Sequence, residues 1–304
     1  MKIFINRRPV EGPWGGGNLF VEALYEYLPL FGHQIVSSLQ DNPGIVFIQN
    51  PVKDSLGVGI KEAIEYKNYN KSVKLVHRVN ECDIRKNTFG LDNFLRECSK
   101  YTNQTIFVSN WMKDYHLEKG WFCKDNRVVY NGVNKEHFKL QPKIQNGKIN
   151  LVTHHWSNNP MKGFDIYEAI DRWVGNRDDF TFTYIGRENG TFSNTNVISP
   201  LAGKALGEEL GKYDLYISAS RFDPGPNHII EAISCGLPLF VHKDGGGSVE
   251  FSSMVDNSHL FANWDSLRNM LTDKEINSNN HLECSLFESW ENCIKEISRC
   301  INEL

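Results

Sequence analysis

Two carboxylates with a defined spacing are the residues of this chain that most clearly predict ligand chemistry. Asp223 stands before a Pro-Gly-Pro turn, and Glu231 follows after seven intervening residues, in the second turn of a helix predicted to start near Asn227. Backbone N–H groups at the start of a helix favour an anion such as phosphate, and carboxylates accept hydrogen bonds from hydroxyls. The pair by itself is therefore compatible with a pocket for a phosphate that carries a sugar or a ribose, without establishing one. The alternative is two ordinary surface or capping acids.

A second candidate is the loop after the first predicted strand, where Gly15, Gly16 and Gly17 precede a helix. Glycines let the backbone approach a ligand closely, and the helix that follows favours an anion. The three glycines are consecutive, so the loop lacks the G-x-G-x-x-G spacing of dinucleotide-binding folds. A ligand-binding loop and a tight strand–helix turn both agree with this segment.

An alternation of strands and helices must position these residues. In the first half, apolar runs predict strands and amphipathic segments predict helices between them. The predicted strands are KIFIN, HQIVS, GIVFIQ, VKLVHRV, TIFVSN and RVVYNG, with helices over 17–32 and around Lys61, Leu95 and Trp111. This order implies a parallel sheet with both faces covered. Ligands of such sheets bind beyond the carboxyl ends of the strands.

The alternation restarts after a polar stretch, Leu140–Asn150, which is the predicted linker. The sequence thus predicts an α/β protein of two domains, 1–142 and 143–285, followed by an amphipathic helix over 286–304. The apolar side of that last helix is formed by Phe287, Cys293, Ile294 and Ile297.

The segment from Asp223 to Glu231 resembles the Glu-x7-Glu region of the retaining GT-B glycosyltransferases of family four, with Asp in the place of the first Glu. Other stretches resemble the same family in the same order: GGGNLFV, VVYNGVNKEHF (128–138), HHWSNNPMKGFDIY (154–167), YIGR (184–187) and KDGGGSVE (243–250). The resemblance implies a GT-B fold, in which two Rossmann-like parallel-sheet domains face a cleft. The first domain would take the acceptor and the second the nucleotide-sugar donor.

The resemblance also implies roles for particular residues. Lys162 matches the family's phosphate-binding lysine, Glu231 its ribose-binding carboxylate, and Asp223 the residue that contacts hydroxyls of the transferred sugar. The catalytic residues expected on this basis are Asp223, Lys162 and Asn80. The residues expected to bind the donor are Gly15, Gly16, Gly17, Gly186, Arg187, Ser199, Leu201, Arg221, Gly225, Asn227, His228 and Glu231.

Three positions depart from the family's pattern. Asp223 is one methylene shorter than the usual Glu. Ser157 stands where the family usually has an Arg, so positive charge at the phosphate must come from other residues, the candidates being Arg221, Arg187 and His154. At the end of the fourth strand, Asn80 takes the place of a cleft histidine, and His77, inside that strand, is the alternative.

The implied reaction moves a sugar from a nucleoside-diphosphate sugar to an acceptor hydroxyl with retention of configuration. Fixed positive groups at the departing phosphate would stabilise its transition state. The resemblance implies that no metal or other cofactor is needed, and the sequence has no His/Asp cluster with metal-ligand spacing that would contradict this. A nucleotide-sugar-binding pseudoenzyme and a GT-B sugar-nucleotide epimerase are the alternatives. A nicotinamide-dependent oxidoreductase is a third, suggested by the glycine loop alone. The acceptor, whether a glycan, a lipid-linked saccharide, a protein or a small molecule, stays open.

Composition indicates the class of protein and the cellular compartment in which this activity would take place. The 304 residues are 40% hydrophobic and 23% charged, which is ordinary globular usage and argues against a disordered or disulfide-dense chain. The seven cysteines have no Cys-x-x-Cys spacing and indicate a reducing compartment. Since we find neither a signal-peptide core nor an apolar stretch long enough to span a membrane, we expect a cytoplasmic protein.

The charges are distributed unevenly along the chain. Residues 1–146 contain 20 basic and 15 acidic side chains, whereas 147–304 contain 13 and 22. Neither half has the clustered basic stripe of a protein that binds nucleic acid. The basic excess of the first half predicts an anionic acceptor or peripheral contact with an anionic membrane through the first domain.

Overall fold

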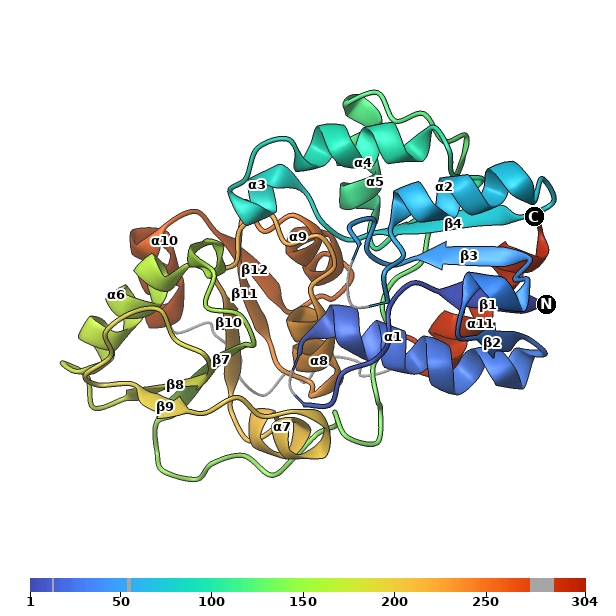
Figure 1. The fold of residues 1–304 in the computed structure, drawn as a ribbon. Coiled ribbons are helices and arrows are strands. Elements are labelled where there is room, and N and C mark those ends of the chain that lie inside the picture. The colour runs from blue at the N-terminus through green and yellow to red at the C-terminus, as the bar shows by residue number, and fades with distance from the viewer. Residues whose placement is uncertain (13, 54–55, 274–286) are drawn as a thin grey trace. The chain divides into compact units, whose positions relative to one another are not determined.

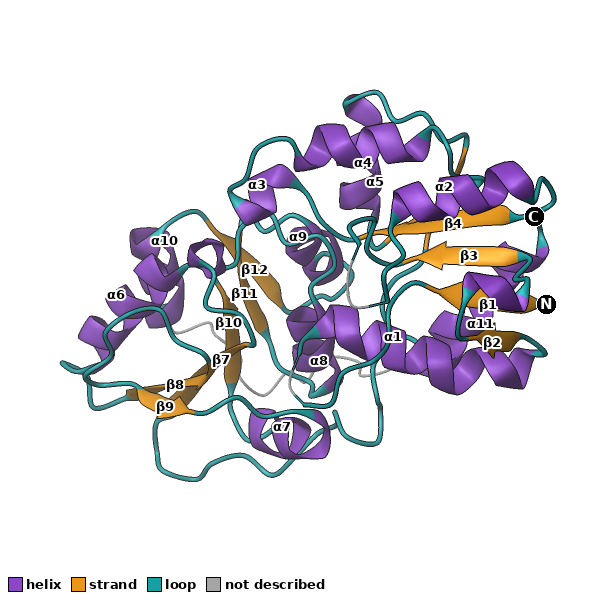
Figure 2. Cartoon of the chain, in the orientation of Figure 1, coloured by secondary structure: helices purple, strands orange, loops and turns teal. Residues whose placement is uncertain are grey.

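The computed structural model describes residues 1–12, 14–53, 56–273 and 287–304. The chain divides into two compact units (Figure 1). The first unit comprises Met1–Gly132 and Glu288–Leu304, and the second comprises Val133–Phe287. Strands and helices alternate along each of them (Figure 2).

The division falls earlier in the chain than the boundary expected after residue 142. The stretch Leu140–Asn150, predicted as a linker, belongs to the second unit. Lys143 in this stretch donates hydrogen bonds to the carbonyl oxygens of Gly211 and Tyr213 in that unit. The predicted last helix is present, and it belongs to the first unit.

Six parallel strands form the sheet of the first unit, in the order β2-β1-β3-β4-β5-β6. They are β1 (Lys2–Ile5), β2 (Gln34–Val36), β3 (Ile45–Ile48), β4 (Lys74–Val79), β5 (Gln104–Phe107) and β6 (Asp125–Val128). The helices are α1 (Gly16–Tyr27), α2 (Ile60–Tyr69), α3 (Asp83–Lys86), α4 (Leu91–Ser99), α5 (Asn110–Glu118) and α11 (Trp290–Asn302), with 3-10 turns η1 (Leu28–Phe31) and η2 (Leu39–Asp41).

Both faces of this sheet are covered, as its continuous apolar strands require. Ile3 and Ile5 of β1 enter one core together with residues of α1 and α11, whereas Phe4 between them enters another core with residues of α2. Successive side chains of a strand point to opposite faces, so one strand supplies both cores. The predicted helix over 17–32 is α-helical only to Tyr27, because Pro29 lacks the N–H that a helix interior needs.

The second unit also has six parallel strands, in the order β12-β11-β10-β7-β8-β9. They are β7 (Ile149–His155), β8 (Phe180–Gly186), β9 (Asn196–Ile198), β10 (Leu215–Ser218), β11 (Leu239–His242) and β12 (Ser258–Phe261). The helices are α6 (Phe164–Val174), α7 (Gly203–Leu210), α8 (Asn227–Ser234), α9 (Gly247–Ser252) and α10 (Trp264–Thr272), with a 3-10 turn η3 (Pro160–Lys162).

In the second unit, α6 and α10 pack on the sheet and contribute Tyr167, Ile170 and Leu267 to the hydrophobic core. Helix α8 is buried almost all round, and the buried residues include the polar His228, Glu231 and Ser234 as well as the apolar ones. The two parallel sheets confirm the predicted α/β class. Helices α9 and α10 and strand β12 were not predicted from the sequence pattern.

Some further features concern only the residues that the structure describes. No described helix is long and apolar enough to cross a membrane. Six of the seven cysteines are described, all six are buried, and no disulfide bond joins any two of them. The remaining one, Cys284, lies outside the described residues.

Candidate functional site

The predicted donor residues of the second unit gather where its strand order reverses. Strands β7 and β10 are neighbours in the sheet, and the chain leaves them toward opposite edges, β8 on one side and β11 on the other. In open parallel sheets such a switch point leaves room for a ligand beyond the carboxyl ends of the strands. Here β7 ends in His154 and His155, and β10 leads through Ser220 to Asp223.

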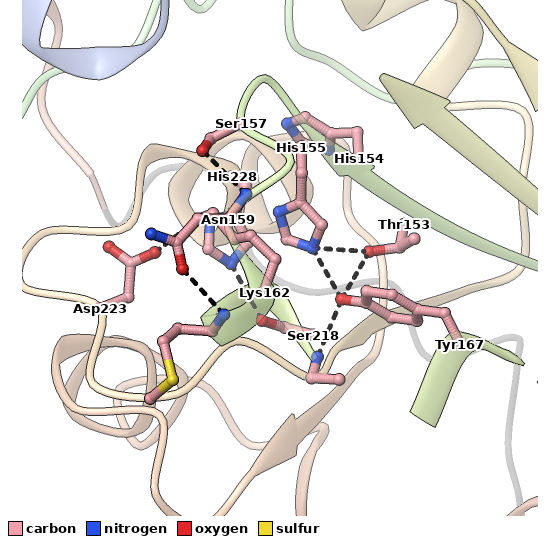
Figure 3. Close-up of polar contacts among 12 residues, drawn as sticks. Thr153, His154, His155, Ser157, Asn159, Lys162, Tyr167, Ser218, Asp223 and His228 are labelled. Atoms are coloured by element: carbon pink, nitrogen blue, oxygen red, sulfur yellow. Dashed lines mark hydrogen bonds and ion pairs between the residues drawn. The ribbon is translucent and has the colours of Figure 1, made fainter. Parts of the chain in front are cut away.

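Lys162 and Asp223 form a buried ion pair at this edge (Figure 3). The distance from Lys162 Nζ to Asp223 Oδ2 is 2.7 Å, and the two side chains are 9% and 10% exposed. Lys162 ends the 3-10 turn η3, which Asn159 caps by accepting a hydrogen bond from the N–H of Met161. The next residue, Gly163, has φ of 86°, and a Cβ there would overlap the carbonyl oxygen of Ala219. Glycine is therefore required for the Lys162 turn to lie against β10.

The backbone around Asp223 is held in a strained conformation. Phe222 has φ of 53°, which is uncommon for a bulky residue, and Gly246 opposite it has φ of 65°. Asp223 accepts a hydrogen bond at its carbonyl from the N–H of Gly247 at 2.7 Å and donates one to the carbonyl of Gly245 at 3.0 Å. These bonds hold the backbone of Asp223, from which its carboxylate reaches Lys162. Strain of this kind concentrates at functional sites.

His154 and His155 point to opposite sides of β7, as neighbouring strand residues must. His154 contacts helix α8, with its Nε2 2.8 Å from Glu231 Oε2. His155 faces α6, with its Nε2 2.7 Å from the hydroxyl oxygen of Tyr167. They therefore do not form a metal-binding pair, and no group of His, Cys, Asp and Glu in the described part of the chain is arranged to hold a metal ion.

Tyr167 connects the end of β7 to the residue that follows β10 (Figure 3). Its hydroxyl oxygen accepts hydrogen bonds from the backbone N–H of Ala219 at 3.0 Å and from the hydroxyl of Thr153 at 3.1 Å. With two donors on this oxygen, the Tyr167 O–H is directed at His155. Burial raises the pKa of Tyr167, so it keeps its proton and the network keeps its direction.

A third histidine, His228, stands in the first turn of α8. Its Nε2 lies 2.9 Å from the hydroxyl of Ser218 at the end of β10. Its ring packs against that of His155 at 5.0 Å between centroids and against that of His154 at 6.2 Å. The expected donor residue His228 is thus part of a buried histidine cluster, which also supports the first turn of α8.

Helix α8 begins at Asn227, as predicted, after Gly225 and the N-cap residue Pro226. No acidic residue stands in its first turn, so the positive end of the helix dipole is not neutralised within that turn. Glu231 is in the second turn and is 8% exposed. The predicted order of turn, helix start and second-turn carboxylate is confirmed.

The other predicted positive groups are engaged elsewhere. Arg221 makes a two-bond ion pair with Asp165 of α6, at 3.0 and 2.7 Å. Burial of Asp165 opposes ionisation, but the hydrogen bonds from Arg221 outweigh it and lower the pKa of Asp165. Arg187 lies over the ring of Trp156, with its guanidinium carbon 5.1 Å from the ring centroid. Three residues were candidates to replace the missing arginine. Of these, only His154 has a side chain that contacts Asp223 or Glu231, and its partner is Glu231.

Gly186 ends β8, next to the end of β7. It has φ of 139°, and a Cβ there would overlap the carbonyl oxygen of His155. That carbonyl accepts the N–H of Arg187 at 3.2 Å. Ser199 and Leu201 follow β9, one strand further along the sheet, with Ser199 exposed and Leu201 half-buried. They share the carboxyl edge with the site, and the structure records no bond from them to Lys162 or Asp223.

The remaining predicted residues belong to the first unit. Gly15, the N-cap of α1, has φ of 75°, and Gly16 and Gly17 begin the helix. A Cβ at Gly17 would lie 3.7 Å from the amide nitrogen of Asn80, which follows β4, so the glycine loop and Asn80 are neighbours. His77 is fully buried within β4, and burial lowers its pKa to about 3. Asn80 is therefore the better placed of the two alternatives.

Sequence reasoning did not identify the network of Tyr167, Ser218 and the three histidines. Two signals were present: a His-His pair at the end of a strand, and a histidine three residues before Glu231. Which partners they meet depends on the packing of β7, β10, α6 and α8, which a local pattern does not specify.

The sequence matches no protein-family model and no curated protein. Solved structures do resemble it throughout. Anabaena Alr3699/HepE, solved with UDP-glucose, is 14% identical with a TM-score of 0.77 and full coverage of both chains. Sucrose-phosphate synthase from Thermosynechococcus elongatus is 12% identical, TM-score 0.69, covering 99% and 98% of the two chains. The lipopolysaccharide outer core galactosyltransferase WaaB is 13% identical, TM-score 0.66, covering 100% and 98%. The two six-stranded parallel sheets are thus those of the GT-B fold.

Proposed function

We propose that this protein is a glycosyltransferase that moves a sugar from a nucleoside-diphosphate sugar to an acceptor hydroxyl. The observation that carries the proposal is the Lys162–Asp223 pair, held at the switch point of the second sheet beside the start of α8. A cation, a helix start and two carboxylates within one unit suit a ligand that combines phosphate, ribose and sugar hydroxyls. The solved relatives with this fold include sugar-transferring enzymes, which agrees with the proposal.

In the proposed reaction the bond between the anomeric carbon and the diphosphate oxygen breaks, and a bond to the acceptor oxygen forms on the same face of the sugar. The departing phosphate oxygen takes the proton of the acceptor hydroxyl. Negative charge grows on the diphosphate as the bond breaks, so Lys162 and the start of α8 would stabilise the transition state more than the ground state. We propose no metal in this role, since these groups supply the positive charge.

Lys162 must exchange partners for this to happen. In the structure its ammonium contacts the Asp223 carboxylate at 2.7 Å. A bound diphosphate would share the ammonium and leave the carboxylate to accept hydrogen bonds from the sugar. The short side chain of Asp223 places its oxygens close to the backbone that Gly245 and Gly247 fix. Retention of configuration and membership of family four form part of the same proposal.

The first unit is proposed to receive the acceptor, a glycan or a lipid-linked or other hydroxyl compound, with Asn80 and the glycine loop as the residues to test. A cytoplasmic location is also proposed, with peripheral membrane contact through a basic part of residues 1–132, which hold 17 basic and 14 acidic side chains.

The test is thermal unfolding with UDP, GDP and ADP and with their sugars, followed by measurement of nucleotide release. A ligand at one hundred times its Kd should stabilise the protein by about 2.7 kcal/mol. Lys162→Ala and Glu231→Ala should lower turnover by about a hundredfold or more. Lys204→Ala, on an exposed lysine paired with Glu208, is the matched control and should retain wild-type turnover.

Each outcome separates the candidates. Stabilisation by a nucleotide sugar with transfer to an acceptor supports the proposal. Tight binding without transfer would indicate a nucleotide-sugar-binding pseudoenzyme, and conversion of the donor sugar into its epimer would indicate an epimerase. Neither stabilisation nor turnover with any donor in the panel would refute a donor site in the second unit.

A further inference from the structure

The carboxylate of Glu231 is held by a histidine from a different element. His154 at the end of β7 places Nε2 2.8 Å from Glu231 Oε2 on α8, and the two side chains are only 8% and 11% exposed. No other side chain among the described residues makes a hydrogen bond to this carboxylate. Oε1 and a second lone pair of Oε2 are thus left to accept hydrogen bonds from a ligand.

The ring of His154 is itself held rigidly. It packs edge-on against Tyr216 at 5.5 Å and against His228 at 6.2 Å between centroids. Its backbone is fixed as well, since the Tyr216 hydroxyl accepts from the His154 N–H and donates to the His154 carbonyl, both at 3.3 Å. A side chain packed on this many sides cannot follow Glu231 if the carboxylate turns.

The surroundings of the His154 ring also determine which of its two nitrogens carries the hydrogen. Nδ1 of His154 is buried, and no described residue pairs with it. A hydrogen on Nδ1 would therefore lack an acceptor there, whereas on Nε2 it meets a carboxylate oxygen. His154 consequently donates from Nε2, and it fixes the rotation of the Glu231 carboxylate with a charge-assisted bond.

We propose that His154 is a positioning residue that aims the Glu231 carboxylate at the 2′- and 3′-hydroxyls of a ribose, and so selects ribonucleoside over 2′-deoxyribonucleoside diphosphates. This inference rests on the proposed donor site. A site built to bind a hydroxyl rejects the analogue that lacks it, because the buried acceptor loses its partner. Such rejection requires that the carboxylate cannot turn away to other partners, and His154 supplies that constraint.

The experiment measures the dissociation constants of UDP, GDP and ADP and of their 2′-deoxy forms by calorimetry. For the wild-type protein we expect the best-bound ribonucleotide to exceed its 2′-deoxy form by about 10- to 100-fold, as for one hydrogen bond to a charged group. In His154→Leu this ratio should fall to about threefold or less, with weaker binding of the ribonucleotide and little change for the deoxy form. His154→Gln, whose amide can donate to Glu231, should restore most of the ratio.

Two further variants separate positioning from general support of the fold. His259→Leu, at an exposed histidine of β12, should leave the ratio unchanged. Glu231→Gln should lower the ratio, and adding His154→Leu to it should lower the ratio no further, because both changes act through one carboxylate.

The failures are distinct. If the wild-type protein binds none of the nucleotides, the proposed donor site itself is wrong. If it binds ribo and deoxy forms equally well, or if His154→Leu retains the wild-type ratio, the donor site stands and the role of His154 is overturned.

Discussion

The Lys162–Asp223 pair is the residue-scale feature with the clearest energetic consequence. Both charges are about one-tenth exposed and 2.7 Å apart. A buried pair adds little net stability, because burying two charges costs about as much as their attraction returns. Removing one partner is different, since it leaves the other charge buried alone.

Lys162→Met should therefore destabilise the free protein by about 3 kcal/mol, whereas Lys162→Met combined with Asp223→Leu should be about as stable as the wild type. Urea unfolding of the wild type, both single variants and the double variant measures this. Additive losses in the double variant would show that the two charges do not depend on each other in the folded protein.

Motif spacing located Lys162, Asp223 and Glu231 correctly in one part of the molecule, since each follows or begins a recognisable element. It did not predict that Glu231 pairs with His154, because these residues are 77 positions apart and meet only when α8 packs on β7. It also did not predict that Asp165 would bind Arg221 across 56 positions. Partner choice between elements depends on packing, and local patterns do not contain that information.

At the scale of elements, glycines decide how closely β7, β8 and β10 approach. Gly186 has φ of 139° and lies against the His155 carbonyl, so any side chain there would push β8 away from β7. Gly147 gives a matched control, because its φ is 73° but no atom lies within 4 Å of the Cβ position.

Gly186→Ala should lower the free energy of unfolding by about 3 kcal/mol or more, since it adds a steric clash to an unfavourable backbone angle. Gly147→Ala should cost about 1 kcal/mol, for the backbone angle alone. Denaturant unfolding of the two variants distinguishes clash from strain. An equal decrease in the free energy of unfolding for both variants would mean that β7 and β8 can move apart to accommodate a side chain at Gly186.

Most elements could be predicted because apolar runs and helical periodicity are local properties. The amphipathic pattern of α11 likewise predicted a helix with an apolar side. The pattern did not predict where that side is buried, which is against α1 and the first sheet, through Cys293, Ile294 and Ile297. An apolar face specifies that a partner exists, and the fold specifies which one.

At the scale of the whole molecule, the position of α11 alters the charge distribution. Counted by unit, the first has 19 basic and 18 acidic residues and the second has 14 and 19. Residues 1–146 have an excess of five basic side chains, of which two belong to 133–146 in the second unit, and the acidic excess of two in 288–304 offsets most of the rest. Contact of the first unit with an anionic membrane would require a local basic cluster, since the unit has almost no net charge.

The two units should also differ as fragments. Residues 133–287 contain a complete sheet and core, so this fragment should fold cooperatively and bind the nucleotide that the whole protein binds. Residues 1–132 lack α11, so they should fold only when joined to 288–304 by a short linker. Circular dichroism and thermal unfolding of the three fragments test this, with Lys295→Ala as a neutral and Ile294→Ala as a destabilising change in the intact chain. Cooperative unfolding of 1–132 alone would contradict it.

The return of α11 to the first sheet has a consequence for synthesis on the ribosome. The second unit is continuous and can form as soon as its own residues emerge, whereas the first unit must keep an unfinished sheet until residues 288–304 are translated. During that interval the surface of α1 and β1 that α11 later covers is exposed to solvent. The first unit is therefore completed after the second. The apolar surface of α1 and β1, exposed until α11 is made, is where a chaperone would bind the nascent protein.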